Sequence, residues 1–245
     1  MRSNAAVAER IAARRPWWRL LHEALVLGGL WGVYTLGRAL AGRHVGAAGE
    51  HASEVWRLER WARLPDEAGV QAWALRRPGL VRVANGYYAY SHWVGLVVVV
   101  ALLLVFRVGY YPRFRRVLVL TTALALVGHL AYPLAPPRMR PDFGLVDTGV
   151  RFGQSVYGAD PANHGLLNQY AAMPSLHIAW AVLFAATAVV VTRSRWRWLA
   201  TAYPTATTWV VVVTANHYWL DGVAGVLLLG IAVAAVWREG RRWPG

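Results

Sequence analysis

The sequence predicts an all-α integral membrane protein with six transmembrane helices and an amphipathic interfacial helix between the first two. Hydrophobic residues make up 57% of the 245 residues and cluster in long blocks. A helix needs about 20 consecutive apolar residues to span a bilayer. Six blocks approach that length: residues 20–41, 83–106, 116–135, 174–192, 197–215 and 218–237. The net charge of +14 comes from arginines that lie mainly between these blocks, which favours a membrane over nucleic acid as the partner. Cysteine is absent, which excludes disulfides and thiolate metal sites.

The first block is expected to be a retained span, because it is too long for a signal peptide and lacks a convincing cleavage site. It follows residues 1–19, a basic tail. Residues 20–237 then form a single membrane domain, and residues 238–245 form a second tail. An even number of spans places both tails on one side, and arginine in the short turns of that side predicts the cytoplasm of a cell-membrane protein.

Residues 43–82 do not fit this charge pattern, because they carry seven arginines on the side predicted to be extracytoplasmic. The stretch EVWRLERWARL, residues 54–64, has apolar residues at helical spacing among charges, with Trp and Arg suited to a headgroup layer. We interpret it as a helix lying on the bilayer surface. The alternative is a lid that covers the active site or admits lipid to it.

Several titratable residues gather at the predicted outer face. His129, His177 and His217 lie near the outer ends of three different spans, and Asp221 lies close to His217. A long loop, residues 136–173, joins spans three and four on the same side, and loops of that length are typically functional or disordered. This face is therefore the place to look for chemistry.

The stretch NHYWLDGVAG places His217 and Asp221 four residues apart, on one face of the sixth helix. A carboxylate beside an imidazole fixes the tautomer of the ring and leaves its other nitrogen free as a base or nucleophile. Small residues at Gly222, Ala224 and Gly225 would let a neighbouring helix approach closely. The alternative is a hydrogen-bonded pair with a purely structural role.

The stretch MPSLH predicts that Pro174 begins the fourth span, since proline suits the first turn of a helix. Ser175 then offers a hydroxyl at a helix start, which is a natural anion site, and His177 could donate a proton there. A packed structural histidine is the alternative.

In the stretch APPRMRP, two prolines stiffen the chain before Arg138. Arg138 is therefore the first candidate for a residue that clamps phosphate, and Arg140 is the second. The alternative is an arginine that anchors the loop to lipid headgroups.

Together these residues suit phosphoryl transfer, in which stabilising charge on the phosphoryl oxygens is most of the work. No carboxylate cluster that would hold magnesium is evident, so we expect a mechanism through histidine with no metal and no cofactor. Zinc on His129, His177 and His217 is the rival assignment.

Pro174-Ser175-x-His177 and His217-x-x-x-Asp221 resemble the second and third signature motifs of the type 2 phosphatidic acid phosphatase superfamily. Its membrane members have six-helix cores. The resemblance implies that His217 is the nucleophile, Asp221 its orienting partner and His177 the acid for the leaving group. It also implies that Ser175 contacts the phosphate.

Two positions depart from the common pattern of that superfamily. Arg140-Pro141 matches the end of the first motif, but Pro133 stands where its lysine is usual. Val210 and Val211 stand where the third motif usually opens with Ser-Arg.

The departures look like the branch that contains inositol phosphorylceramide synthases and their bacterial relatives. Segments similar to APPR, FGLVDT and YAAMPSLH recur there, as does the pattern Asn85-x-x-Tyr88-x-x-x-His92. The resemblance covers about residues 85–225. It adds Tyr88, His92 and His129 as candidate residues of a headgroup or acceptor pocket.

The sequence therefore predicts a membrane enzyme that removes phosphate from a phospholipid or a polyprenyl phosphate at the extracytoplasmic face. One alternative is a phosphotransferase that moves a lipid-borne phosphoryl headgroup to inositol or another alcohol. A second is a non-enzymatic lipid or ion transporter, since buried histidines and an aspartate also build proton relays.

Overall fold

The structure is a computed structural model that describes residues 25, 28–29, 32, 45–155 and 169–240. Over those residues the chain is all-helical and contains no strand. The elements, in order, are α3 (Val45–Trp61), α4 (Glu67–Leu75), α5 (Pro78–Phe106), η1 (Val108–Tyr110), α6 (Tyr111–Ala131), η2 (Pro137–Met139), η3 (Pro141–Phe143), α7 (Thr148–Arg151), α8 (Leu176–Val191), η4 (Arg195–Thr201), α9 (Ala202–Val213) and α10 (Trp219–Gly240). Most of the predicted first span, and residues 156–168 of the long loop, lie outside the described residues.

Three helices are long and apolar enough to cross a membrane: Pro78–Phe106, Val108–Ala131 and Trp219–Arg238. They correspond to the second, third and sixth predicted spans and indicate a membrane-embedded protein. The fourth predicted span is the shorter apolar helix α8, with 16 residues. The fifth is a 3₁₀ segment, η4, followed by the 12-residue α9. The described part of the chain thus shows three full-length candidate spans, and six spans remain a prediction.

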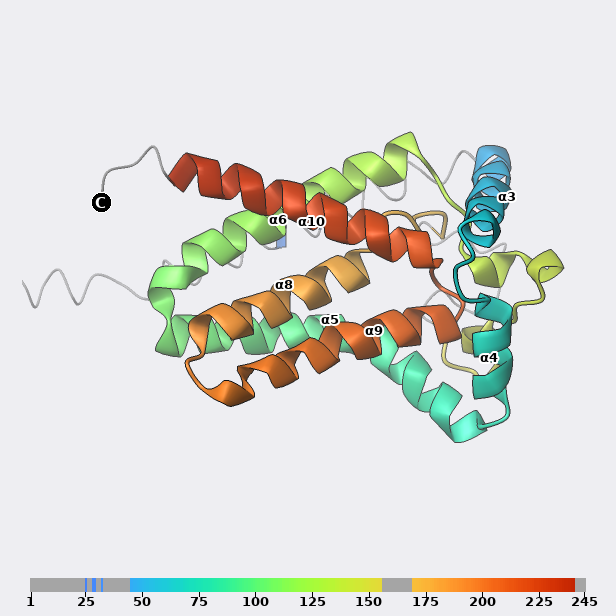
Figure 1. The fold of residues 1–245 in the computed structure, drawn as a ribbon, viewed down its shortest axis with the longest axis horizontal. Coiled ribbons are helices and arrows are strands. Elements are labelled where there is room, and N and C mark those ends of the chain that lie inside the picture. Colours follow the sequence, from blue (N-terminus) through green and yellow to red (C-terminus); the bar gives the residue numbers. More distant parts are fainter. Residues whose placement is uncertain (1–24, 26–27, 30–31, 33–44, 156–168, 241–245) are drawn as a thin grey trace, which may run out of the picture.

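The helices that carry the apolar blocks run roughly along the long axis of the molecule, while α3 and α4 lie across one end (Figure 1). The same end holds the start of α8, the start of α10 and the end of α9. The α8–α9 turn and the end of α10 lie at the opposite end (Figure 1). The loops after α6 therefore meet the first turns of α8 and α10.

Local chemistry explains where the long helices begin and end. Proline stands in the first turn of both α5 and α6, where its missing N–H costs nothing. α6 ends at Ala131, short of the predicted limit at 135, because Pro133 disfavours helical geometry at Tyr132. The Asp66 side chain caps α4 by accepting hydrogen bonds from the backbone N–H groups of Ala68 and Gly69. The bond from Gly69 is the shorter, at 2.9 Å.

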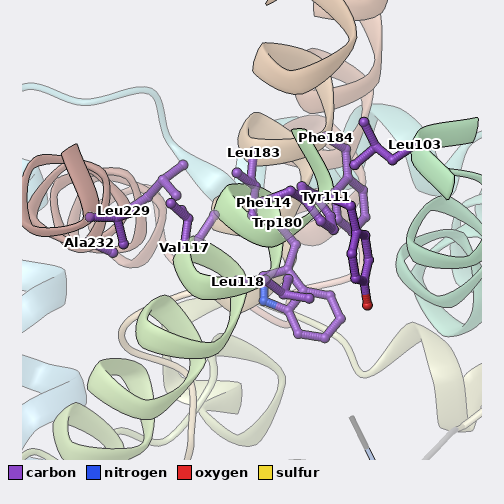
Figure 2. Packing of buried hydrophobic residues seen from close by; sticks show 12 residues of the cluster. Leu103, Tyr111, Phe114, Val117, Leu118, Trp180, Leu183, Phe184, Leu229 and Ala232 are labelled. Atoms are coloured by element: carbon purple, nitrogen blue, oxygen red, sulfur yellow. The ribbon is translucent and has the colours of Figure 1, made fainter. Parts of the chain in front are cut away.

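The main hydrophobic core packs α6 and α8 against α5 and α10. Figure 2 shows its aromatic centre, in which Trp180 and Phe184 of α8 lie against Phe114 of α6. The Trp180 indole N–H also donates to the Thr122 hydroxyl at 3.2 Å, so its polar group is satisfied inside the core. This core fixes the relative placement of the helices whose first turns form the site.

α3 buries a different face from the one its composition predicts. Ala52, Val55 and Glu59 follow one helical stripe and are buried against the protein, although Glu59 is acidic. Leu58 and Trp61, expected on the apolar face together with Val55, are 49% and 81% exposed. The exposed pair is available to a bilayer surface, and α3 as an interfacial helix remains a prediction.

Candidate active site

A tight turn between α9 and α10 presents His217. The turn passes through Ala215, which has a left-handed backbone (φ 53°). The amides of Asn216 and His217 both donate to the Val211 carbonyl, at 2.9 and 3.2 Å. His217 is thereby held just before α10 by the backbone of the preceding helix.

The hydrogen bonds of the His217 ring define its tautomer. Its Nδ1 lies 2.9 Å from the Ala172 carbonyl oxygen and 3.2 Å from Oδ2 of Asp221. A carbonyl oxygen only accepts, so Nδ1 carries the proton and Nε2 keeps its lone pair when the ring is neutral. Oδ2 of Asp221 also accepts from the Tyr218 amide at 3.0 Å. The fully buried Asp221 therefore fixes the orientation of His217, the contact expected from their spacing.

The start of α8 lies two positions after the predicted one. Ser175, not Pro174, marks the boundary: its hydroxyl accepts from the Ile178 amide as the helix cap, and the helix begins at Leu176. The cap explains the shift, because serine is strongly preferred at that position. His129 supports the same turn, with its Nε2 3.0 Å from the Pro174 carbonyl oxygen. The structure thus brings His129 to the backbone of the motif.

Glycines on α10 allow this turn to approach closely, as expected for Gly222 and Gly225. The Ser175 amide donates to the Asp221 carbonyl at 2.9 Å. A Cβ at Gly225 would stand 2.5 Å from the Ser175 carbonyl oxygen, and one at Gly222 would stand 2.6 Å from Ile178. The absence of side chains here lets α8 and α10 bring their first turns together.

We expect Gly225→Ala to destabilise the protein and to reduce turnover together, because backbone cannot move aside as a flexible side chain can. Overpacking of this kind costs about 1–3 kcal/mol. Gly230→Ala, on the same helix with nothing within 4 Å, is the matched control. Thermal unfolding in detergent measures the difference, and equal unfolding temperatures for the two variants would contradict the close approach.

His177 faces His217 from the first turn of α8. Their ring centroids are 5.7 Å apart. The His177 ring stacks on Tyr88 of α5 at 4.4 Å and meets the ring of His92 edge-on at 4.5 Å. The sequence patterns around residues 88, 177 and 217 therefore converge, although they come from α5, from α8 and from the turn before α10. Tyr88 and His92 thus border the site by contacting the ring of His177.

Arg138 is built into the same end of the molecule. Its amide donates to the Ala215 carbonyl at 2.8 Å, and its Nε donates to Oδ1 of Asn216 at 3.0 Å. Its Nη1 donates to Oε1 of Gln169 at 3.4 Å and lies 3.9 Å from Oδ2 of Asp147. The guanidinium is buried beside the residue that precedes His217, which suits a fixed positive charge.

Arg140 has a different environment. It forms a two-point ion pair with Asp142, with distances of 2.9 and 2.6 Å, and also donates to the Ser53 hydroxyl and the Gly49 carbonyl on α3. Its guanidinium holds the pKa of the Asp142 carboxyl below its usual range. Arg140 thus joins the loop to α3.

Asn216 and Gln169 were not among the predicted site residues. Both are neutral amides, and sequence patterns give such residues no distinctive signal outside a known motif. Asn216 could have been found from its place directly before His217. Gln169 could not, because its contact with Arg138 depends on how the long loop folds.

Within residues 45–155 and 169–240, no group of three His, Cys, Asp or Glu side chains is placed to hold a metal ion. The three histidines of the zinc alternative are not arranged as such a group.

Comparison with known proteins identifies the family of the chain. The chain matches the PAP2 superfamily over residues 53–235, which is most of its length, and the protein belongs to that superfamily. No curated protein and no solved structure matches the chain. Members are typically phosphatases or phosphotransferases, so membership supports an enzyme with a phosphatase-type function on lipid phosphates. The apolar helices suit a bilayer. The narrower resemblance to inositol phosphorylceramide synthases remains a prediction.

Proposed function

We propose that the protein is a membrane lipid phosphatase that hydrolyses a lipid phosphate or diphosphate through a phosphohistidine on His217, without a metal ion. The observation that carries the proposal is the arrangement of the His217 ring. Nδ1 is committed to Asp221 and the Ala172 carbonyl, which leaves Nε2 as the nucleophile, and the ring of His177 lies 5.7 Å away.

In the first step, the lone pair on Nε2 of His217 attacks phosphorus and the bond from phosphorus to the lipid oxygen breaks. His177 gives a proton to the departing oxygen, so that a neutral alcohol leaves, or a lipid monophosphate when the substrate is a diphosphate. Asp221 stabilises the positive charge that develops on the His217 ring.

In the second step, water attacks the phosphohistidine. His177, which is now neutral, takes a proton from the water, and the bond between nitrogen and phosphorus breaks to release inorganic phosphate. Both histidines return to their starting states. One acid and one nucleophile therefore serve both halves of the reaction.

Charge on the phosphoryl oxygens needs fixed donors. Arg138 supplies a guanidinium that matches two phosphate oxygens at once. The first turn of α8 supplies backbone N–H groups beside Ser175, and helix starts favour anions. In this arrangement Arg138 binds the phosphate, while Arg140 keeps the loop attached to α3.

We expect Arg138→Lys to lower kcat/KM by roughly 10- to 100-fold, since a hydrogen bond to a charged group contributes about 1.5–3 kcal/mol. Arg140→Lys should lose less turnover and more thermal stability, because it weakens the ion pair with Asp142. Kinetics on one lipid phosphate, paired with unfolding temperatures, separate the two. A larger kinetic loss at Arg140 would reverse the assignment.

The active site is proposed to face the outside of the cell, with the two termini in the cytoplasm. The α8–α9 turn and the end of α10 lie toward the opposite end from the site (Figure 1). The turn contains Arg193, Arg195 and Arg197, and the end of α10 contains Arg238. Arginine enrichment in short loops marks the cytoplasmic side.

Phosphate release by the detergent-purified protein in EDTA tests the function. The panel would hold phosphatidate, polyprenyl monophosphate and polyprenyl diphosphate. We expect release from at least one lipid in the presence of the chelator. Release that requires an added divalent ion would contradict the metal-independent mechanism.

A phosphotransferase is the second candidate, favoured by the contacts of Tyr88 and His92 with His177. These side chains border the group that would activate an acceptor, and an alcohol such as inositol could take the place of water there. Such an enzyme would acquire a base-stable phosphoryl label from a lipid donor. It would release that label to the alcohol faster than to water.

A further inference from the structure

Two buried glutamates connect α3 and α4 with the start of α10. Glu59, near the end of α3, is 0% exposed, and Glu67, the first residue of α4, is 1% exposed. Glutamate is almost never fully buried unless it is paired, because a charged carboxylate loses its hydration. Sequence patterns placed both among the charges of an interfacial segment, and the structure buries them instead.

Glu59 contacts the first turn of α10 directly. Its Oε1 accepts from the Leu220 amide at 2.8 Å, and backbone N–H groups in a first turn have no partner within their own helix. Next to it, the Trp219 indole N–H donates to the Pro65 carbonyl at 2.8 Å. The end of α3 and the turn after it are thus bonded to α10 at two residues, Leu220 and Trp219, which come directly before Asp221.

The second oxygens of the two carboxyls reveal a shared proton. Oε2 of Glu59 and Oε1 of Glu67 are both buried, and neither has a hydrogen-bond partner among the described residues. Two neighbouring carboxyls can satisfy such oxygens by sharing one proton, and Glu67 is one of the groups that raise the pKa of Glu59. Oε2 of Glu67 accepts from Nη2 of Arg60 at 2.7 Å, so Glu67 is the ionised partner and Glu59 holds the proton.

The charges around the pair agree with this assignment. Arg60 forms ion pairs with both Glu67 and the exposed Asp66. Glu67 and Asp221 add negative charge around Glu59. Burial first, and then the hydrogen bond from Glu59 to Glu67, raise the pKa of Glu59 to about 9. Tyr218, at the start of α10, is the other titratable group that faces the two acids.

We propose that Glu59 is a positioning residue: as a neutral acid it bridges Glu67 and the Leu220 amide, and so holds the start of α10 with His217 and Asp221. The shared proton is a property of the fold. Its consequence for turnover rests on the proposed function.

The position of this proton sets a pH dependence. The pKa of Glu59 is raised from 4.5 to about 9, so its contribution to stability is full below about pH 4.5 and declines as the pH rises. Above about pH 9 the proton is lost, and two buried carboxylates then repel each other beside Asp221. The clamp on α10 therefore weakens in alkali.

Glu59→Gln is the sharpest test, because an amide keeps both bonds and cannot ionise. Its oxygen accepts from the Leu220 amide, and its NH₂ group donates to Glu67 at any pH. Glu59→Leu removes both bonds. Glu50→Gln, an exposed acid on the same helix, is the matched control.

We expect the infrared difference spectrum between wild type and Glu59→Gln at pH 7 to show a protonated carboxyl band, which Glu50→Gln leaves unchanged. The unfolding temperature of the wild type should fall as the pH rises from about 4.5 to about 9, and its turnover should fall as the pH passes about 9. Both changes should be smaller in Glu59→Gln, because an amide cannot ionise. Glu59→Leu should lose both properties at every pH.

The proposal is overturned if the difference spectrum lacks a protonated carboxyl, or if the unfolding temperature of Glu59→Gln falls with rising pH as steeply as that of the wild type. These two measurements need no substrate. A wild type that turns over no lipid phosphate would therefore count against the proposed function, while the spectrum and the unfolding curves would still decide on the carboxyl pair.

Discussion

Replacing His217 by alanine is expected to lower phosphate release by roughly 10⁴-fold or more, the scale seen when a covalent nucleophile is removed. The reason is that the Ala172 carbonyl at 2.9 Å and Asp221 at 3.2 Å set the tautomer of the His217 ring and leave its Nε2 as the attacking nitrogen. The measurement is phosphate release in EDTA, together with a test for phosphoryl label on the protein. Both should disappear in the variant.

Asp221→Asn provides a graded companion to this variant. An amide can still accept from Nδ1 of His217, but it removes the negative charge that stabilises the charged ring. We expect a loss of roughly 10²–10⁴-fold with the label still detectable. His51→Ala, which removes a ring that bonds to the Pro133 carbonyl outside the two histidine motifs, controls for loss of a histidine near the site. Full turnover in His217→Ala would refute the phosphohistidine mechanism.

The parts of the site that sequence reasoning predicts well are those set by local spacing. His217 and Asp221 are four residues apart, and that spacing predicts their contact. The structure corrects one detail, because His217 lies in the turn before α10 and only Asp221 lies in the helix. Gly222 and Gly225 follow the same logic, since a pair of glycines on one face predicts a close neighbour. The identity of that neighbour, the Ser175 turn, was not available from spacing alone.

The two arginines show where local reasoning stops. Arg138 and Arg140 share the same short motif, yet one turns toward Asn216 and the other toward α3. Arg138 lies within the 3₁₀ turn η2, whereas Arg140 lies between η2 and η3. Asp142, two residues after Arg140, could have indicated that Arg140 forms an ion pair within the loop.

Burial of Glu59 could not be predicted because it depends on a contact across 161 positions of the chain, with Leu220. Composition places a glutamate on the solvated face of an amphipathic helix. The buried stripe of α3 overrides that preference, since the free backbone amides at the start of α10 need an acceptor.

Replacing His177 by asparagine is expected to separate the two halves of the reaction. The variant lacks the acid that protonates the leaving oxygen, and it lacks the base that activates water. Loss of general acid–base catalysis should reduce turnover of a lipid phosphate by roughly 10²–10⁴-fold. An aryl phosphate does not need the acid, because its phenolate leaves without protonation. Its phosphohistidine still needs the base that activates water.

With an aryl phosphate that the wild type accepts, His177→Asn should therefore release phenol in a burst and hold the phosphoryl group on His217. The expected label is stable in base and lost in acid, and it should be absent from the double variant with His217→Ala. Tyr88→Phe, which keeps the ring that stacks on His177 at 4.4 Å, controls for disturbance of α5 packing. If His177→Asn instead lost phenol release and labelling together while its unfolding temperature stayed at the wild-type value, His177 would be needed for attack itself. The acid would then have to be sought elsewhere, with His92 as the nearest candidate because its ring meets His177 at 4.5 Å.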